Sequence, residues 1–213
     1  MLQSKSIKKT KSQMDMINGP LWNKIPLFAL PVAATAILEQ LFNASDIAIV
    51  GNFAVGDRTA AVAAVGANSS IIGLIVFFFI GFALGVNAVI ANAIGRNDRP
   101  AVQKAVHTAI LMALVAGFFA TILGEIFAKK LLTMINVPPD VFSMALTYLR
   151  IYLLGLPVIL LYNFEAAIFR SIGETKMPLK ALAFSGVLNV LLNLFFVIVL
   201  KRSVDGVAAA TVI

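Results

Sequence analysis

The sequence predicts an all-α polytopic membrane protein with five complete transmembrane helices and the start of a sixth. Two compositional observations support this: 60% of the 213 residues are hydrophobic and only 13% are charged. Soluble domains carry about 25% charged residues. The third observation is that the apolar residues form long runs separated by short polar turns. A helix of about 20 apolar residues is long enough to cross a bilayer, so the lipid bilayer is the expected surrounding.

The composition also excludes several kinds of site. The chain contains no cysteine, so it has no disulfide and no thiolate metal site, and its single histidine (His107) excludes a multi-histidine metal site. The formal net charge of +7 comes from basic residues at the ends of apolar runs, which is typical of membrane topology and does not indicate nucleic-acid binding. We expect no cofactor.

Residues 1–24 are predicted to be a basic cytoplasmic segment, and residues 25–213 a transmembrane unit. If the N-terminus is inside, that side of the membrane holds eleven of the 17 Lys and Arg residues and the other side holds six. An excess of Lys and Arg marks the cytoplasmic side. The chain is therefore expected in the inner or plasma membrane with a cytoplasmic N-terminus.

The first helix is expected over residues 25–50. Pro31 removes a backbone hydrogen bond inside it, so it is a candidate hinge, with a simple packing kink as the alternative. The second helix, over 62–94, is longer than a membrane crossing requires. Its Gly81 and Gly85 form a small-residue pair that is expected to let another helix pack closely.

The third helix is expected over 101–128, where Glu125 can pair with Lys129 one turn later. A fourth helix follows over 141–171 and a fifth over 179–200. The last apolar run, 207–213, is predicted to begin a sixth helix.

Polar residues interrupt the first helix in a regular pattern. Gln40, Asn43 and Asp46 are three residues apart, so they form one polar stripe on a helix. A carboxylate at membrane depth costs about 2.5 to 3.5 kcal/mol on insertion scales, and it is tolerated mainly where it faces a bundle interior or a wet cavity. Glu39 is a rival carboxylate, since seven residues separate it from Asp46 and both can share a face.

Further polar side chains recur in later helices. Asn163 and Glu165 lie in the second half of the fourth helix, and Asn189 and Asn193 lie one turn apart in the fifth. No nucleophile elbow, zinc-protease motif or phosphate loop is present. The sequence therefore indicates a polar cavity in a membrane bundle and does not indicate an enzyme.

Three stretches resemble the multidrug and toxic compound extrusion (MATE) transporters: LFNASDIAIVGNF, the segment from Gly81 to Asp98 that ends in IGRND, and RSIGETKMP. The resemblance implies the N-terminal lobe of a secondary antiporter that expels organic, often cationic compounds in exchange for Na⁺ or H⁺. Carrying the family's motif residues over to this sequence implies a set of ion- or proton-coupling residues and a set of cavity-lining polar residues. Na⁺ near Asp46 is the only metal ion expected. The coupling set is Asp46, Asn163, Asn189, Asn193 and Thr211, and the cavity-lining residues are Glu39, Gln40 and Asn43.

The chain departs from the family pattern in two respects. Asn193 stands where many members have Asp, which puts a two-carboxylate Na⁺ site in doubt and concentrates proton chemistry on Asp46. The family also has two six-helix lobes, and the second is absent from this chain. We therefore expect a fragment, a truncated product or half of a two-chain assembly. The alternatives are a lipid-linked oligosaccharide flippase of related fold and a non-transporting membrane module.

Overall fold

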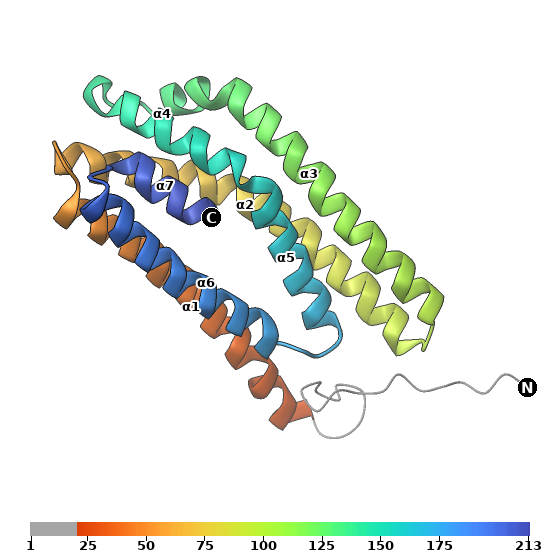
Figure 1. Ribbon diagram of the computed structural model, residues 1–213. Coiled ribbons are helices and arrows are strands. Elements are labelled where there is room, and N and C mark those ends of the chain that lie inside the picture. Colours follow the sequence, from red (N-terminus) through yellow and green to blue (C-terminus); the bar gives the residue numbers. More distant parts are fainter. Residues whose placement is uncertain (1–20) are drawn as a thin grey trace, which may run out of the picture.

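Figure 1 presents the protein as a computed structural model in which residues 21–213 are described. Most of the predicted segment 1–24 thus lies outside the described residues. Helices make up the described chain, joined by short turns. The elements in chain order are α1 (Leu21–Phe53), α2 (Arg58–Gly95), α3 (Arg99–Met134), α4 (Pro139–Leu154), α5 (Leu156–Ser171), α6 (Lys176–Leu194), the π-helical segment η1 (Phe195–Val199) and α7 (Val204–Val212).

The predicted all-α polytopic fold is confirmed for this part of the chain. Four helical segments (α1, α2, α3 and α6 with η1) are long and apolar enough to cross a membrane, and the bent pair α4 and α5 makes a fifth if it is counted as one span. α7 lies where the sequence predicts the start of a sixth helix. α2 has 38 residues, so at 1.5 Å per residue it is about 57 Å long and extends beyond a hydrocarbon core of about 30 Å.

The fourth span is not the single continuous helix that the sequence predicts over 141–171. α4 and α5 meet at Gly155 with a bend of 52°. Pro157 has no backbone N–H, so the carbonyl of Leu153 loses the donor that a regular helix would supply. The hydroxyl of Thr121 in α3 donates to that carbonyl at 2.7 Å. A neighbouring helix therefore supplies the hydrogen bond that the proline removes.

Small residues on α3 allow it to approach this bend closely. A Cβ added at Gly117 would lie 2.5 Å from the Cα of Pro157, and one at Gly124 would lie 2.6 Å from the Leu153 side chain. The sequence predicts such a contact for Gly81 and Gly85 of α2, but a Cβ at either would meet no atom within 4 Å. That prediction is wrong within the described chain, because the pattern marks small residues without marking which face meets a neighbour.

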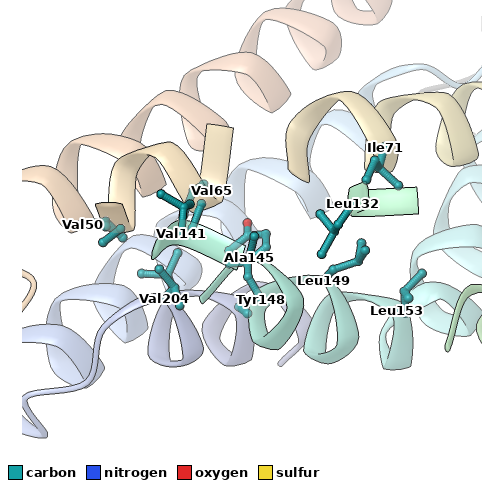
Figure 2. Packing of buried hydrophobic residues seen from close by; sticks show 14 of the residues in the cluster. Val50, Val65, Ile71, Leu132, Val141, Ala145, Tyr148, Leu149, Leu153 and Val204 are labelled. Carbon is teal, nitrogen blue, oxygen red and sulfur yellow. The ribbon is translucent and has the colours of Figure 1, made fainter. Parts of the chain in front are cut away.

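The main hydrophobic core lies where α4 packs against α2 and α7 (Figure 2). It contains aliphatic side chains from the three helices: Val65, Ile71, Val141, Leu149, Leu153, Val204 and Val207. Within it, the fully buried Asn68 of α2 donates its amide to the carbonyl of Ala145 in α4 at 2.9 Å. This bond holds α2 against α4 in a region that offers few other polar contacts.

Glu125 forms its ion pair with a neighbouring helix. Its carboxylate lies 3.4 Å from Nε of Arg150 in α4, whereas the sequence suggests Lys129 one turn along α3. Both charged side chains are partly exposed. The pair therefore links α3 and α4 on the N-terminal side of the bend in the fourth span.

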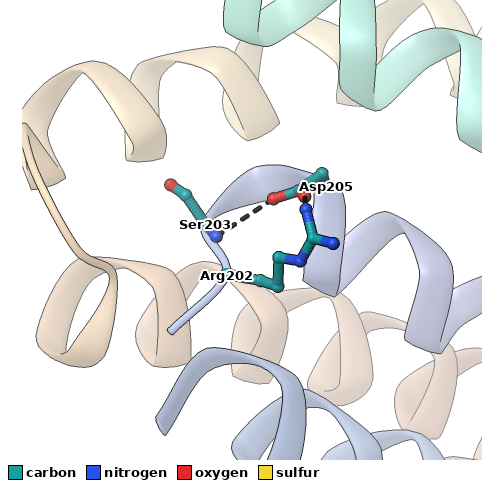
Figure 3. A network of polar contacts seen from close by, with 3 residues as sticks. All are labelled: Arg202, Ser203 and Asp205. Atoms are coloured by element: carbon teal, nitrogen blue, oxygen red, sulfur yellow. Dashed lines mark hydrogen bonds and ion pairs between the residues drawn. The ribbon is translucent and has the colours of Figure 1, made fainter. Parts of the chain in front are cut away.

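A capped turn fixes the start of α7 (Figure 3). One carboxylate oxygen of Asp205 accepts a hydrogen bond from the Ser203 backbone N–H at 3.1 Å, and the other accepts one from Arg202 at 3.0 Å. Gly206 then packs against the Cβ atoms of Phe196 and Arg202. The turn thus directs the last helix back along the lobe.

α1 and α6 lie side by side and run in the same direction (Figure 1). Phe42 faces Gly186, where an added Cβ would collide with the ring, and Asp46 faces Asn193 further along both helices. By contrast, α1 and α5 have no Cα atoms within 8 Å of each other. Side chains of these two helices can therefore face one another without backbone packing between them.

Candidate functional site

Asp46 lies at the centre of a polar network among α1, α6 and α7. Its side chain is only 4% exposed. One carboxylate oxygen accepts a hydrogen bond from Nδ2 of Asn193 at 2.6 Å, and the other accepts one from the hydroxyl of Thr211 at 3.3 Å. Both partners are neutral, so the carboxylate has hydrogen-bond donors but no basic side chain to balance its charge.

The network continues through the two asparagines of α6. Nδ2 of Asn193 also lies 3.1 Å from Oδ1 of Asn189, whose own Nδ2 donates to the Thr211 hydroxyl oxygen at 3.3 Å. The Thr211 hydroxyl has a second acceptor within reach, the carbonyl of Val207 at 3.0 Å. Because a hydroxyl has one proton to donate, Thr211 can serve either Val207 or Asp46 but not both fully.

Oxygen atoms are the ligands that this site can offer to a cation. Oδ1 of Asn193 is buried and has no hydrogen-bond partner among the described residues. The Nδ2 of the same side chain contacts the carboxylate of Asp46 and Oδ1 of Asn189. Carboxylate, amide carbonyl and hydroxyl oxygens suit hard cations. The described residues contain no group of three or more His, Cys, Asp or Glu side chains that could hold a metal ion.

Local packing places each member of the network. The contact between Phe42 and Gly186 brings α1 close enough to α6 for Asp46 to reach Asn193. Asn189 and Asn193 share a face because they are one helical turn apart. The capped turn before α7 sets the direction in which Thr211 approaches. Four of the five residues expected in the coupling set therefore meet in one network.

The fifth residue, Asn163, lies apart from this network. Its amide donates to the carbonyl of Ile159 in its own helix at 2.9 Å. Gln40 and Asn43 are exposed, so the predicted polar stripe is only partly turned inward. Pro31 lies within α1, which continues through it as one helix.

Helices α4 and α5 carry side chains that the sequence reading did not assign to the site. All three tyrosines of the chain lie there. Tyr148 and Tyr152 are within electrostatic range of Asp46, and Tyr152 and Tyr162 are within range of Glu39. The rings of Tyr148 and Tyr152 stack with centroids 6.5 Å apart. The sequence feature that could have identified this pair is the four-residue spacing, which places both tyrosines on one face of a helix.

Arg170, near the end of α5, also lies within electrostatic range of Glu39 and Tyr162. From the sequence, Arg170 is placed at the end of the predicted fourth helix and is assigned no role. The acidic residues of α1 and the aromatic and basic residues of α4 and α5 thus form one facing set. Its members are Glu39, Asp46, Tyr148, Tyr152, Tyr162 and Arg170.

Comparison with known proteins identifies relatives over most of this structure. A sequence model of the family described as MatE matches residues 31–195. "Probable multidrug resistance protein YpnP" from Bacillus subtilis is 27% identical over 201 residues, which is 93% of this chain and 44% of that protein. The chain therefore spans less than half the length of this curated relative.

Solved structures share the fold. One is described as "Reverse polarity of binding pocket suggests different function of a MOP superfamily transporter from Pyrococcus furiosus". It matches with a TM-score of 0.86 and 23% identity, and the match covers 96% of this chain and 44% of that chain. Another, described as "Crystal structure of MATE in the bent conformation", matches with a TM-score of 0.84 and 24% identity over 91% of this chain and 42% of that one.

Proposed function

The chain belongs to the MatE family, and from this membership we propose that it forms the N-terminal lobe of a secondary antiporter driven by H⁺ or Na⁺. The proposed cargo is small organic cations. The observation that carries the proposal is the Asp46 network: a buried carboxylate, in a membrane helix, with only neutral partners. Such a group is costly unless its charge is balanced, and a proton or a sodium ion would balance it.

A proton can be accommodated with little movement of heavy atoms. While Asp46 is ionised, the Thr211 hydroxyl donates to it. If Asp46 takes up a proton on the oxygen nearest Thr211, it can donate to that hydroxyl instead, and Thr211 can donate to the carbonyl of Val207 at 3.0 Å. The hydroxyl has two lone pairs, so it can still accept from Asn189.

A sodium ion would use the same oxygens in another way. The carboxylate of Asp46 would supply one ligand, and Oδ1 of Asn193 would supply another once the amide turns so that Oδ1 replaces Nδ2 beside the carboxylate. In either case the ion neutralises Asp46 and alters its bonds to α6 and α7. Coupling of this kind requires that the ion and the substrate favour different conformations. The weakened backbone at Pro31 is the proposed point at which α1 bends.

The proposed partners are a second lobe and the substrate between the two lobes. The chain spans 44% of the length of the YpnP relative, which fits one lobe of two. Asn163 is the outlying member of the proposed coupling set, since its amide bonds within its own helix. Glu39, Gln40 and Asn43 remain proposed cavity-lining residues.

The proposal is tested by a transport assay. The natural full-length protein is purified and reconstituted in liposomes. We expect uptake or release of a fluorescent organic cation to respond to an imposed pH or Na⁺ gradient, and the responsive gradient identifies the ion. Asp46→Asn should abolish most of that response, by about tenfold or more, as expected when a typical coupling free energy is lost. Asp140→Asn, a matched change at an exposed residue of α4, should leave it intact.

Two results would contradict this proposal. Full gradient-driven transport by Asp46→Asn would remove Asp46 from the coupling role. Absence of any gradient-driven cation flux, in protein shown to be folded, would favour the non-transporting module. Movement of a lipid-linked oligosaccharide instead would favour the flippase.

A further inference from the structure

Glu39 is a second carboxylate on the inward side of α1. It lies seven residues before Asp46, which places the two within about 20° of each other around the helix, because each residue turns the helix by about 100°. Its side chain is half-buried. Unlike Asp46, it takes no part in the network with α6 and α7, so the ion-coupling scheme leaves it without a role.

Arg170 supplies the opposite charge from α5. The guanidinium attracts the Glu39 carboxylate electrostatically, yet the two groups do not form a direct salt bridge in the described chain. Nε of Arg170 is buried and has no hydrogen-bond partner there. The two charges come from helices whose backbones do not pack together, since α1 and α5 have no Cα atoms within 8 Å of each other.

Tyr162 helps to fix the position of this basic group. Its hydroxyl donates to the carbonyl of Pro178 at the start of α6, at 3.2 Å. The ring is therefore held between the two helices, within electrostatic range of both Arg170 and Glu39. An acid, a base with an unused donor and a held aromatic ring thus form one cluster of groups from α1 and α5.

We propose that Glu39 and Arg170 form a compensating charge pair that determines which sign of charge the interior of the lobe accepts. The proposal rests on the proposed transport function and names the residues that set its charge selectivity. The pair leaves Asp46 as the only unbalanced charge in the facing set. The other groups of that set, and the partners of Asp46 on α6 and α7, are neutral.

Simple charge balance gives opposite consequences for the two residues. With Asp46 ionised, the facing set carries two negative charges and one positive charge, so its net charge is −1. Loss of Glu39 makes the set neutral, or positive once Asp46 is neutralised. Loss of Arg170 makes the net charge −2. One unit charge at about 10 Å, at an effective dielectric constant of about 20, changes the affinity of a singly charged ligand by about tenfold.

The test measures equilibrium binding of two dyes, the cation ethidium and the anion carboxyfluorescein, to the purified protein in nanodiscs. The quantity compared is the ratio of the two association constants, cation over anion. We expect Glu39→Gln to lower this ratio about tenfold and Arg170→Gln to raise it about tenfold. The double variant should return close to the wild-type ratio, because the two charges cancel. Lys180→Gln, at an exposed lysine of α6, removes a positive charge elsewhere and should change little.

A merely structural role would give another pattern. Both single variants would then weaken both dyes together, and that result overturns the proposal, as does a wild-type protein that binds neither dye. If the single variants do not fold, the exchange Glu39→Arg with Arg170→Glu keeps the pair neutral, and it should bind the dyes with the wild-type ratio. A different ratio in the folded exchange variant contradicts the proposal. Failure of gradient-driven flux with the expected binding ratios would reject only the transport function.

Discussion

At the residue scale, polar side chains in this lobe hold helices together by bonding to backbone carbonyls of a neighbouring helix. Asn68 reaches Ala145, and Asn87 of α2 reaches the carbonyl of Ala167 in α5 at 3.1 Å. Thr121 bonds to Leu153 in the same way. In bilayers such bonds contribute about 0.6 kcal/mol each on average. Their main effect here is geometric, because each hydrogen bond fixes the register between two helices.

Thr121→Val is expected to destabilise the protein by about 1 kcal/mol, because it leaves the Leu153 carbonyl without a donor. The measurement is the free energy of unfolding in mixed micelles. Thr133→Val is the control: that hydroxyl is exposed and bonds to Lys129 in its own helix, so the change should cost little. In a Pro157→Ala background residue 157 regains its N–H, and the cost of Thr121→Val should shrink. An equal cost in both backgrounds would contradict this account.

The residue types in the sequence indicate the site, but the sequence does not show which residues of different helices contact each other. Asp46 was identifiable as a costly carboxylate in an apolar helix. Its contact with Asn193 joins residues 147 positions apart, and helical spacing within one segment says nothing about the register between two helices. The resemblance to a family supplied those partners. It did not supply the different position of Asn163, or the facing tyrosines and Arg170, which depend on how α4 and α5 bend.

At the scale of the element, α3 shows how small residues position a bend. Gly117 and Gly124 lie two turns apart on one face of the helix, which contacts the end of α4 and the start of α5. Hydropathy predicted the number of spans because length and apolar content determine it. It missed the break at Gly155, since a proline inside a span is compatible with a kinked helix as well as a divided one.

Gly117→Ala should therefore destabilise the protein by about 1 to 3 kcal/mol, the usual cost of overpacking. The new methyl group would lie 2.5 Å from the Cα of Pro157. A backbone atom cannot relieve this clash by a change of rotamer, as a side chain can. Gly81→Ala is the matched control, because its methyl group meets nothing within 4 Å; it should be neutral or slightly stabilising. Equal unfolding midpoints for the two variants would show that α3 does not pack as described.

At the scale of the whole molecule, the turns alternate between two ends of the bundle. The turn after α1 and the turn after α2 lie at opposite ends, as the helix order requires (Figure 1). The uneven distribution of Lys and Arg predicts that the end with the α2–α3 turn lies on the cytoplasmic side. The positive-inside rule therefore gives an orientation that can be checked directly.

The orientation can be checked by cysteine labelling, because the sequence contains no native cysteine that would also react. A single cysteine at Val55, which is exposed in the α1–α2 turn, should react with a membrane-impermeant maleimide in intact cells. One at Arg96, in the α2–α3 turn, should react only after the membrane is opened. Labelling is read as a mass shift. The reverse pattern would invert the assigned orientation.

The short turns also limit how the helices can separate. Apart from the single residue at Gly155 and the direct continuation of α6 into η1, each connection between consecutive described helices contains three or four residues, and four residues span at most about 14 Å. Each turn therefore acts as a tether at one end of its helix pair. α1 and α5 share no such tether and have no backbone contact. At the seam between them the two helices can move apart without breaking a backbone contact between themselves, and Glu39 and Arg170 belong to its two sides.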